Sequence, residues 1–243
     1  LLNGCVAPVQ FHSEGWGMNL NCDIQLKVNL DGSCSLVAIF SLKEASRAPF
    51  RLHQVASQWQ NRNWRTALFL EGDEEKLVIS KNLGSVSQLH NEFAIGAFVL
   101  PTVFYPNAEW KSSYYVFLTK WEFELLFEPY GREALRCPSC GGTGQVVGEQ
   151  GYTKCPHCNG TGLVQTNLSA ELHAEFPGKV VQTNGEARGN TVYWNLSLKT
   201  LMGGEKLVAK GLYLHWAALI VATSLSLVMS TIFSNICGGP SAS

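Results

Sequence analysis

The chain has 243 residues, and 18 Lys and Arg face 19 Asp and Glu, which gives a net charge of −1. At about 150 residues per domain this length predicts one or two domains, and the balanced charge argues against a nucleic-acid partner. Charged residues make up 15% of the chain, against about 25% in an ordinary soluble domain. The eight cysteines are too few for a disulfide scaffold, and four of them are clustered.

The N-terminal segment, residues 1–18, opens with the letters LLNGC and so places a cysteine at Cys5. Apolar residues and a small residue before a cysteine resemble the lipobox at which bacterial lipoproteins are cleaved and lipidated. One interpretation is therefore that Cys5 is lipidated and that the domain lies outside the cytoplasm. The other is an ordinary cysteine near the start of a strand.

Residues 19–30 alternate strictly between polar and apolar side chains, which predicts a half-buried strand. Asp31 and Gly32 then mark a hairpin turn. A three-residue loop would pair Leu30 with Cys34, so that the apolar side chains of the second strand lie on the same face of the sheet as those of the first. In that register Cys22 and Cys34 lie roughly 26 Å apart, so they cannot form a disulfide and we expect both in the core.

Eight further segments carry helix or strand patterns. A helix is expected at 49–62 and a shorter one at 85–93, with strands at 64–70, 76–80, 115–125 and 168–176, and a hairpin of 191–198 with 205–209. The acidic residues 71–75 are expected to form a solvated turn. Together these elements predict an α+β fold, with a mainly antiparallel sheet and one or two covering helices, built from residues 19–131 and 164–210.

Four cysteines follow the pattern C-x2-C-x14-C-x2-C, which is the spacing of a four-thiolate metal site. They are Cys137, Cys140, Cys155 and Cys158. Two residues between cysteines let both sulfurs point at one ion, and the glycines that follow allow tight turns whose N–H groups face sulfur. Four protein ligands leave no open position, so we expect one structural Zn ion in an inserted lobe at 132–163. Iron and redox-active CxxC pairs are the alternatives.

Residues 212–233 contain no charged side chain. As a helix they would span about 33 Å, close to the roughly 30 Å of a bilayer core. This predicts a single C-terminal transmembrane helix, followed by a short tail at 234–243; the alternative is a buried helix of a globular core. The lysines before the span favour a cytoplasmic or stromal domain, whereas the lipobox favours the opposite side.

Small side chains recur every four residues within this segment and would form one stripe for packing against another helix. They are Ala218, Ala222, Ser226 and Ser230.

The repeated CxxCxGxG motif resembles the cysteine-rich zinc region of DnaJ-type co-chaperones. That family has four such repeats where this chain has two, enough for one ion. The resemblance implies binding to partner polypeptides. The sequence lacks the His-Pro-Asp tripeptide of a J-domain, so recruitment of a heat-shock ATPase is not implied.

The remainder resembles a membrane-anchored family of unknown function from cyanobacteria and plastids, similar to LppM-type lipoproteins. The segments that carry the resemblance are 4–6, 29–33, 176–181, 184–185 and 190–194. It implies a photosynthetic lineage and a thylakoid or plasma membrane location, with membrane lipid around the anchor. It implies no catalytic residues.

The sequence contains no GxSxG, HExxH or P-loop motif, and we expect no enzyme. The expected function is that of a membrane-anchored binding protein. It would act as an assembly factor or accessory subunit of an integral membrane protein complex, such as a photosystem, with the zinc finger making the protein contact. The alternatives are a zinc or thiol holdase or disulfide chaperone at the membrane, and a lipid-binding lipoprotein.

Overall fold

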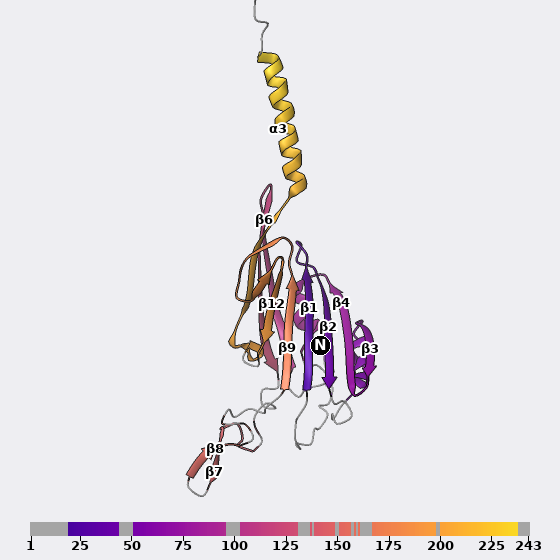
Figure 1. Cartoon of the computed structure of the whole chain (residues 1–243), viewed down its shortest axis with the longest axis vertical. Helices are drawn as coiled ribbons and strands as arrows, with labels where there is room; N and C mark the ends of the chain where they lie inside the picture. The colour runs from indigo at the N-terminus through magenta and orange to yellow at the C-terminus, as the bar shows by residue number, and fades with distance from the viewer. Residues whose placement is uncertain are drawn as a thin grey trace, which may run out of the picture.

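The computed structural model describes residues 19–43, 51–95, 103–130, 137, 139–148, 151–156, 158, 160, 167–197 and 200–237. In this part of the chain the strands form a seven-stranded sheet, a four-stranded sheet and a small hairpin (Figure 1). The two larger sheets share one hydrophobic core.

The seven-stranded sheet has the order β11-β12-β9-β1-β2-β4-β3. Strands β1 and β9 pair in parallel, and the other neighbours are antiparallel. The strand bounds are β1 Asn19–Val28, β2 Cys34–Lys43, β3 Arg65–Glu71, β4 Glu74–Leu83, β9 Asn167–Glu175, β11 Glu186–Arg188 and β12 Thr191–Leu196.

The four-stranded sheet has the order β10-β13-β6-β5 and is antiparallel throughout. Its strands are β5 Val103–Tyr114, β6 Leu118–Tyr130, β10 Lys179–Thr183 and β13 Leu207–Leu214. A short π-helical segment, η4 (Thr200–Gly204), carries the chain from β12 in one sheet to β13 in the other. The predicted hairpin of 191–198 with 205–209 is therefore wrong, because β12 pairs with β9 and β13 pairs with β6.

The predicted hairpin between β1 and β2 forms, but its register differs by two residues. Val28 pairs with Cys34, and a five-residue loop replaces the three-residue one. The Asp31 carboxylate holds this loop by accepting hydrogen bonds from the Ser33 N–H and hydroxyl, at 2.9 and 2.7 Å. An even shift keeps every side chain on its face, so Cys22 and Cys34 are buried in the core as predicted. Burial raises the pKa of the Cys34 thiol to about 12.

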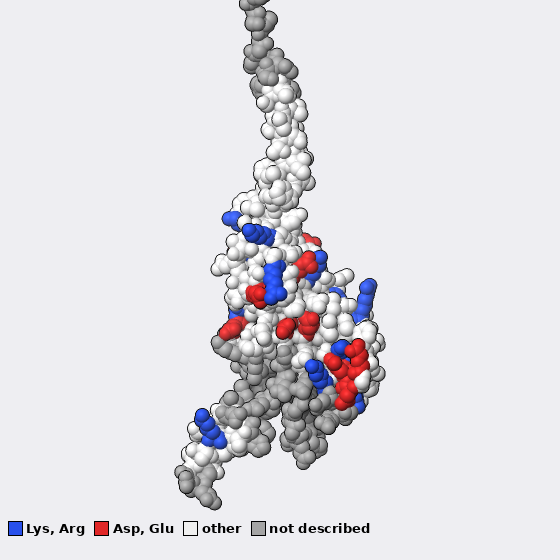
Figure 2. All heavy atoms as spheres, viewed as in Figure 1, with Lys and Arg blue, Asp and Glu red and all other residues white. Residues whose placement is uncertain are grey.

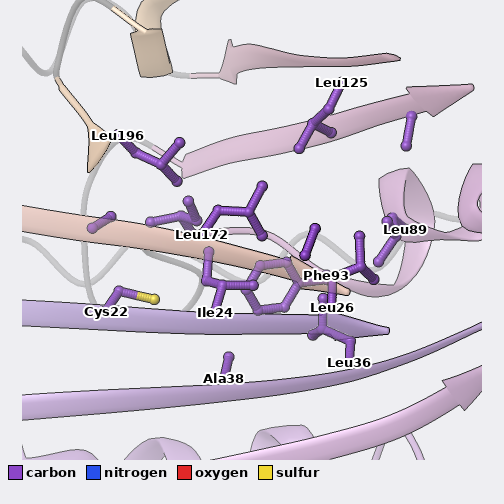
Figure 3. Close-up of a cluster of buried hydrophobic side chains, with 14 of the residues drawn as sticks. Cys22, Ile24, Leu26, Leu36, Ala38, Leu89, Phe93, Leu125, Leu172 and Leu196 are labelled. Atoms are coloured by element: carbon purple, nitrogen blue, oxygen red, sulfur yellow. The ribbon is translucent and has the colours of Figure 1, made fainter. Parts of the chain in front are cut away.

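Aromatic rings fill the space between the two sheets. The Trp121 ring lies between Trp110 and Phe176, with centroid distances of 5.6 and 4.8 Å. Aliphatic side chains from β1, β2, β6, β9 and β12 point into the same layer (Figure 3). Such a filled interior is the source of most of the folding free energy in a sheet sandwich.

Two short helical segments cover the part of the core next to β3, β4 and β5. Helix α1 (Leu52–Gln60), the 3-10 turn η2 (Val86–Gln88) and helix α2 (Leu89–Glu92) confirm the helices predicted at 49–62 and 85–93. Trp59 of α1 packs on Trp64 and Phe93, with ring centroids 5.2 and 6.1 Å apart.

The fold is a mostly β architecture, so the predicted α+β class is wrong. In the described residues the two sheets bury each other's inner faces, and the helices next to them are too short to form a layer of their own. The small hairpin consists of β7 (Gln145–Gly148) and β8 (Gly151–Lys154).

The predicted transmembrane helix at 212–233 is also wrong. Residues 212–214 belong to β13 and pair with Leu118–Lys120 of β6, so helix α3 (Trp216–Cys237) begins four residues later than predicted. Within the described ranges, no helix combines the length and the apolar character needed to cross a membrane. Helix α3 extends from the end of β13 (Figure 1), and Figure 2 shows no charged side chain on its described part.

Glu75 corrects the prediction of a solvated acidic turn at 71–75. Its side chain is buried because position 75 lies on the inner face of β4. One carboxylate oxygen accepts a hydrogen bond from the Leu52 N–H at 2.6 Å, and the other lies 3.2 Å from the Arg51 guanidinium. Glu75 therefore supplies the negative charge that the N-terminus of α1 lacks in its own first turn.

We predict that Glu75→Ala lowers the free energy of unfolding by about 1–3 kcal/mol, because it leaves a buried N–H without an acceptor. Urea unfolding followed by tryptophan fluorescence measures the change. The control is Glu109→Ala, whose carboxylate is exposed on β5 and should change stability by less than about 0.5 kcal/mol. Equal effects of the two substitutions would contradict the capping role of Glu75.

Candidate metal centre

The β7–β8 hairpin brings the four predicted ligands together. Cys137 and Cys140 precede β7, and Cys155 and Cys158 follow β8. Gln145 pairs with Lys154 at the open end of the hairpin, so the two CxxC segments leave it side by side. All four Sγ atoms lie within 4.8 Å of one another and could hold a metal ion.

The sulfur positions fit a tetrahedral ion. The Sγ atoms of Cys137 and Cys155 are 3.8 Å apart, and those of Cys140 and Cys158 are 3.7 Å apart. Metal–sulfur bonds of about 2.3 Å in a tetrahedron require sulfurs about 3.8 Å apart. A disulfide bond is about 2.05 Å long, and all four cysteines are free. The donor set therefore fits a thiolate-binding metal, and these distances suit zinc and iron equally.

Backbone groups around the sulfurs support a charged thiolate cluster. Cys137, Cys155 and Cys158 are buried, whereas Cys140 is partly exposed. The Gly144 N–H donates to Cys140 Sγ at 3.3 Å, and the Gly144 carbonyl accepts from the Cys155 N–H at 2.9 Å. The first contact stabilises negative charge on sulfur, and the second joins the two CxxC segments.

Only glycine fits at position 144. Its φ is +74°, and a Cβ added there would lie 2.4 Å from the Gly160 carbonyl oxygen. The glycines of the two CxxCxGxG repeats thus pack against each other, which explains in physical terms why the motif repeats. Gly141 also has a positive φ, of +58°, but a Cβ there would meet nothing within 4 Å.

The other predicted site residues lie elsewhere. Cys5 falls outside the described residues. The stripe of Ala218, Ala222, Ser226 and Ser230 lies along α3; its two alanines are half-buried and its two serines are exposed. Docking of another helix on this stripe stays a prediction.

A polar hollow of about 580 Å³ lies against β9, β11 and β12, and no motif in the sequence points to it. Arg188 forms an ion pair with Glu186 at 2.8 Å and lies over the Tyr193 ring at 5.1 Å. His173 lies 3.5 Å from Glu171. The described lining contains no serine or cysteine nucleophile beside the histidine. We assign the hollow no catalytic role.

No protein-family model matches the sequence, and no curated protein matches it. Among solved structures, the chain is similar to the folded domain of LppM from Mycobacterium tuberculosis, determined by NMR. The two are 14% identical with a TM-score of 0.39, and the match covers 85% of this chain and 96% of that one. A likeness of this size carries no argument about function.

We predict that the purified protein holds one metal ion per chain and that Cys155→Ala abolishes stoichiometric binding, because three thiolates no longer close the tetrahedron. Elemental analysis after dialysis measures the metal content. Cys34→Ala removes a buried thiol of the sheet core instead, and the metal content should stay at one ion per chain. Full metal occupancy in the Cys155 variant would show that the four cysteines are not the ligands.

We predict that Gly144→Ala weakens metal binding by about 10–100-fold, the range found when groups that contact metal ligands are disturbed. Competition with a chromophoric chelator gives the affinity. Gly141→Ala is the matched control, because it introduces the same backbone strain without the clash. This variant should lose less metal affinity than Gly144→Ala. Equal losses would mean that strain alone, and not the packing of Gly144 on Gly160, explains the result.

Proposed function

We propose that the protein is a non-enzymatic binding protein in which a β-sandwich carries a small zinc-stabilised lobe that contacts a partner protein. The observation that carries this proposal is the closed set of four sulfurs around one tetrahedral position. Four protein ligands leave no position for water or substrate, so the ion serves to fold the lobe. A structural role agrees with the small size of the hairpin, which is too short to be stable alone.

Zinc is the metal we propose. Four thiolates in two CxxC pairs are the usual ligand set of structural zinc, which has no redox chemistry and no geometric preference other than that of its ligands. An iron centre with the same ligands is the competing assignment, and elemental analysis of the purified protein separates the two.

The lobe presents an apolar surface that suits a protein contact. Val147 and Tyr152 lie directly opposite each other on β7 and β8, and each is 79% exposed. Val146 instead turns toward the cysteines. Exposed aromatic and aliphatic side chains are enriched at binding surfaces. In Figure 1 the hairpin lies at the end of the molecule opposite to α3, away from the sheets.

We further propose that the partner belongs to a membrane protein complex, in which this protein acts as an assembly factor or accessory subunit. Support comes from α3, whose uncharged surface exposes large apolar side chains that need cover from another apolar surface. They are Trp216, Ile220, Val221, Leu225, Leu227, Val228 and Met229. A photosynthetic complex is proposed on the sequence resemblance alone.

The two alternatives have less support. A lipid-binding lipoprotein would need an apolar cavity, but the layer between the sheets is filled by side chains, including the stacked rings of Trp110, Trp121 and Phe176. A thiol chaperone would need the cysteines to move between a metal-bound and a disulfide form, and the buried cluster of three cysteines favours a permanent ligand role.

We predict that the double substitution Val147→Ser and Tyr152→Ser lowers recovery of the native partner after cross-linking in cells, with zinc content unchanged. Quantitative mass spectrometry compares the cross-linked proteins with those of wild type. The matched control is Gln145→Ser with Lys154→Ser, a polar pair on the same hairpin, which should recover the same proteins in wild-type amounts. Equal recovery by both variants would remove this hairpin surface as the contact.

A further inference from the structure

Strand β3 is the terminal strand of the seven-stranded sheet, and it is unusually apolar for that position. Among the described residues it pairs with β4 on one side and has no neighbouring strand on the other. Leu68, Phe69 and Leu70 are 37%, 50% and 66% exposed. Natural proteins usually protect such edges with charges, prolines or bulges, because an open apolar edge pairs with another strand. The middle of β3 carries none of these protections.

Both faces of β3 share this exposure. Thr66, Leu68 and Leu70 lie on the inner face, where their neighbours on β4 are the buried Ile79, Leu77 and Glu75. Arg65, Ala67, Phe69 and Glu71 lie on the outer face. A further strand beside β3 would therefore bury apolar surface on both sides of the sheet at once.

We propose that the edge of β3 pairs antiparallel with β3 of a second copy of this chain, about a two-fold axis at Leu68. In this register Arg65 of each copy lies opposite Glu71 of the other. Across the two copies Ala67 lies opposite Phe69 and Thr66 lies opposite Leu70, and Leu68 lies opposite Leu68 of the second copy. Inner-face residues meet inner-face residues throughout, so the two sheets become one continuous sheet. An interface of this kind closes on itself and stops at a dimer.

Charge complementarity is the reason that the occupant is a second copy. The only charged residues of β3 are Arg65 and Glu71, one at each end. Antiparallel self-pairing places these opposite charges together twice. Displacing the axis by one residue to Phe69 places Glu71 opposite Ala67, and displacing it to Ala67 places Arg65 opposite Phe69. The register at Leu68 satisfies both charges and pairs every residue of the strand.

The charges beside β3 reinforce this register. Glu71, Asp73 and Glu74 gather at the β3–β4 turn, where Figure 2 shows a cluster of acidic side chains. Lys76 pairs with Glu71 at 3.0 Å, but one lysine against Glu71, Asp73 and Glu74 leaves this end of the strand negatively charged. The antiparallel arrangement brings Arg65 of one copy to this acidic end of the other, whereas parallel pairing would place like charges together.

Sedimentation velocity of the full chain, in the same mild non-ionic detergent throughout, tests the dimer. Arg65→Glu and Glu71→Arg alone should each weaken dimerisation by about tenfold or more, because each creates two like-charge contacts. The double swap of both residues should restore it to within about threefold of wild type. Arg188→Glu, on the opposite edge strand β11 of the same sheet, should have no effect.

Cysteine cross-linking tests the register. Opposite Cα atoms in an antiparallel pair are about 4.5–5.5 Å apart, which suits a disulfide, so Leu68→Cys should form a disulfide-linked dimer on mild oxidation. Leu70→Cys should not, because the two cysteines would be displaced by four residues, or about 13 Å. Peptide mapping by mass spectrometry identifies the bond.

Three results would overturn the proposal. The first is a wild-type chain that stays monomeric at about 100 μM, a concentration far above a micromolar Kd. The second is a double charge swap that fails to restore the dimer. The third is cross-linking through residue 69 or 70 in preference to residue 68. Pairing of β3 with a different protein would give the first of these. Restoration by the double swap, together with cross-linking at residue 68, would establish the two-fold pairing.

Discussion

Strand β1 lies between β2 and β9, and its parallel pairing with β9 joins the two halves of the chain into one sheet. The pairing runs from Asn19 opposite Asn167 to Lys27 opposite Glu175. It closes a loop of more than a hundred residues, but the entropic cost of closure grows only with the logarithm of loop length. Burial of Ile24, Leu26 and Leu172 in the shared core offsets that cost. The segment between the two strands supplies β2, β3 and β4 of the same sheet and β5 and β6 of the other, whereas the cysteine lobe is an insertion between β6 and β9.

The sequence predicted individual strands better than their partners. Alternation along β1 and β9 identified the strands and their buried faces, because a period of two is a local property. Along β6 it identified the buried positions, but it placed the start of the strand too early, since Tyr115 and Phe117 are exposed before Leu118. The length of the β1–β2 loop is not encoded in that alternation, and the hydrogen bonds of Asp31 to Ser33 decided it. The closeness of β12 and β13 in the sequence also favoured a hairpin between them, but β12 pairs with β9 and β13 pairs with β6. The pairing partners of β12 and β13 depend on contacts between distant segments of the chain, and the class of the fold depends on the same contacts.

The grouping of the four cysteines could be predicted from the CxxC spacing, since Cys137 and Cys140 are held by one tight turn and the β7–β8 hairpin brings the second pair beside them. The capping role of Glu75 could not be predicted from the sequence. Its burial follows from its place on β4, and the N–H group that it accepts from belongs to a helix more than twenty residues away. The error at the C-terminus has a related cause. Hydropathy does not distinguish an apolar strand from an apolar helix, and Leu212 and Leu214 continue β13 before α3 begins.

The cysteine lobe has a small core of its own, formed by Cys137, Cys155 and Cys158 with Cys140 and Val146 around them, and this cluster is separate from the core of the sandwich. A protein with two independent cores has two cooperative folding units. Under the proposed function, loss of the proposed ion would melt the lobe and leave the sheets folded, so the proposed partner contact would follow the availability of metal in the cell. The same independence lets evolution alter or remove the insertion between β6 and β9 without rebuilding the scaffold that carries it.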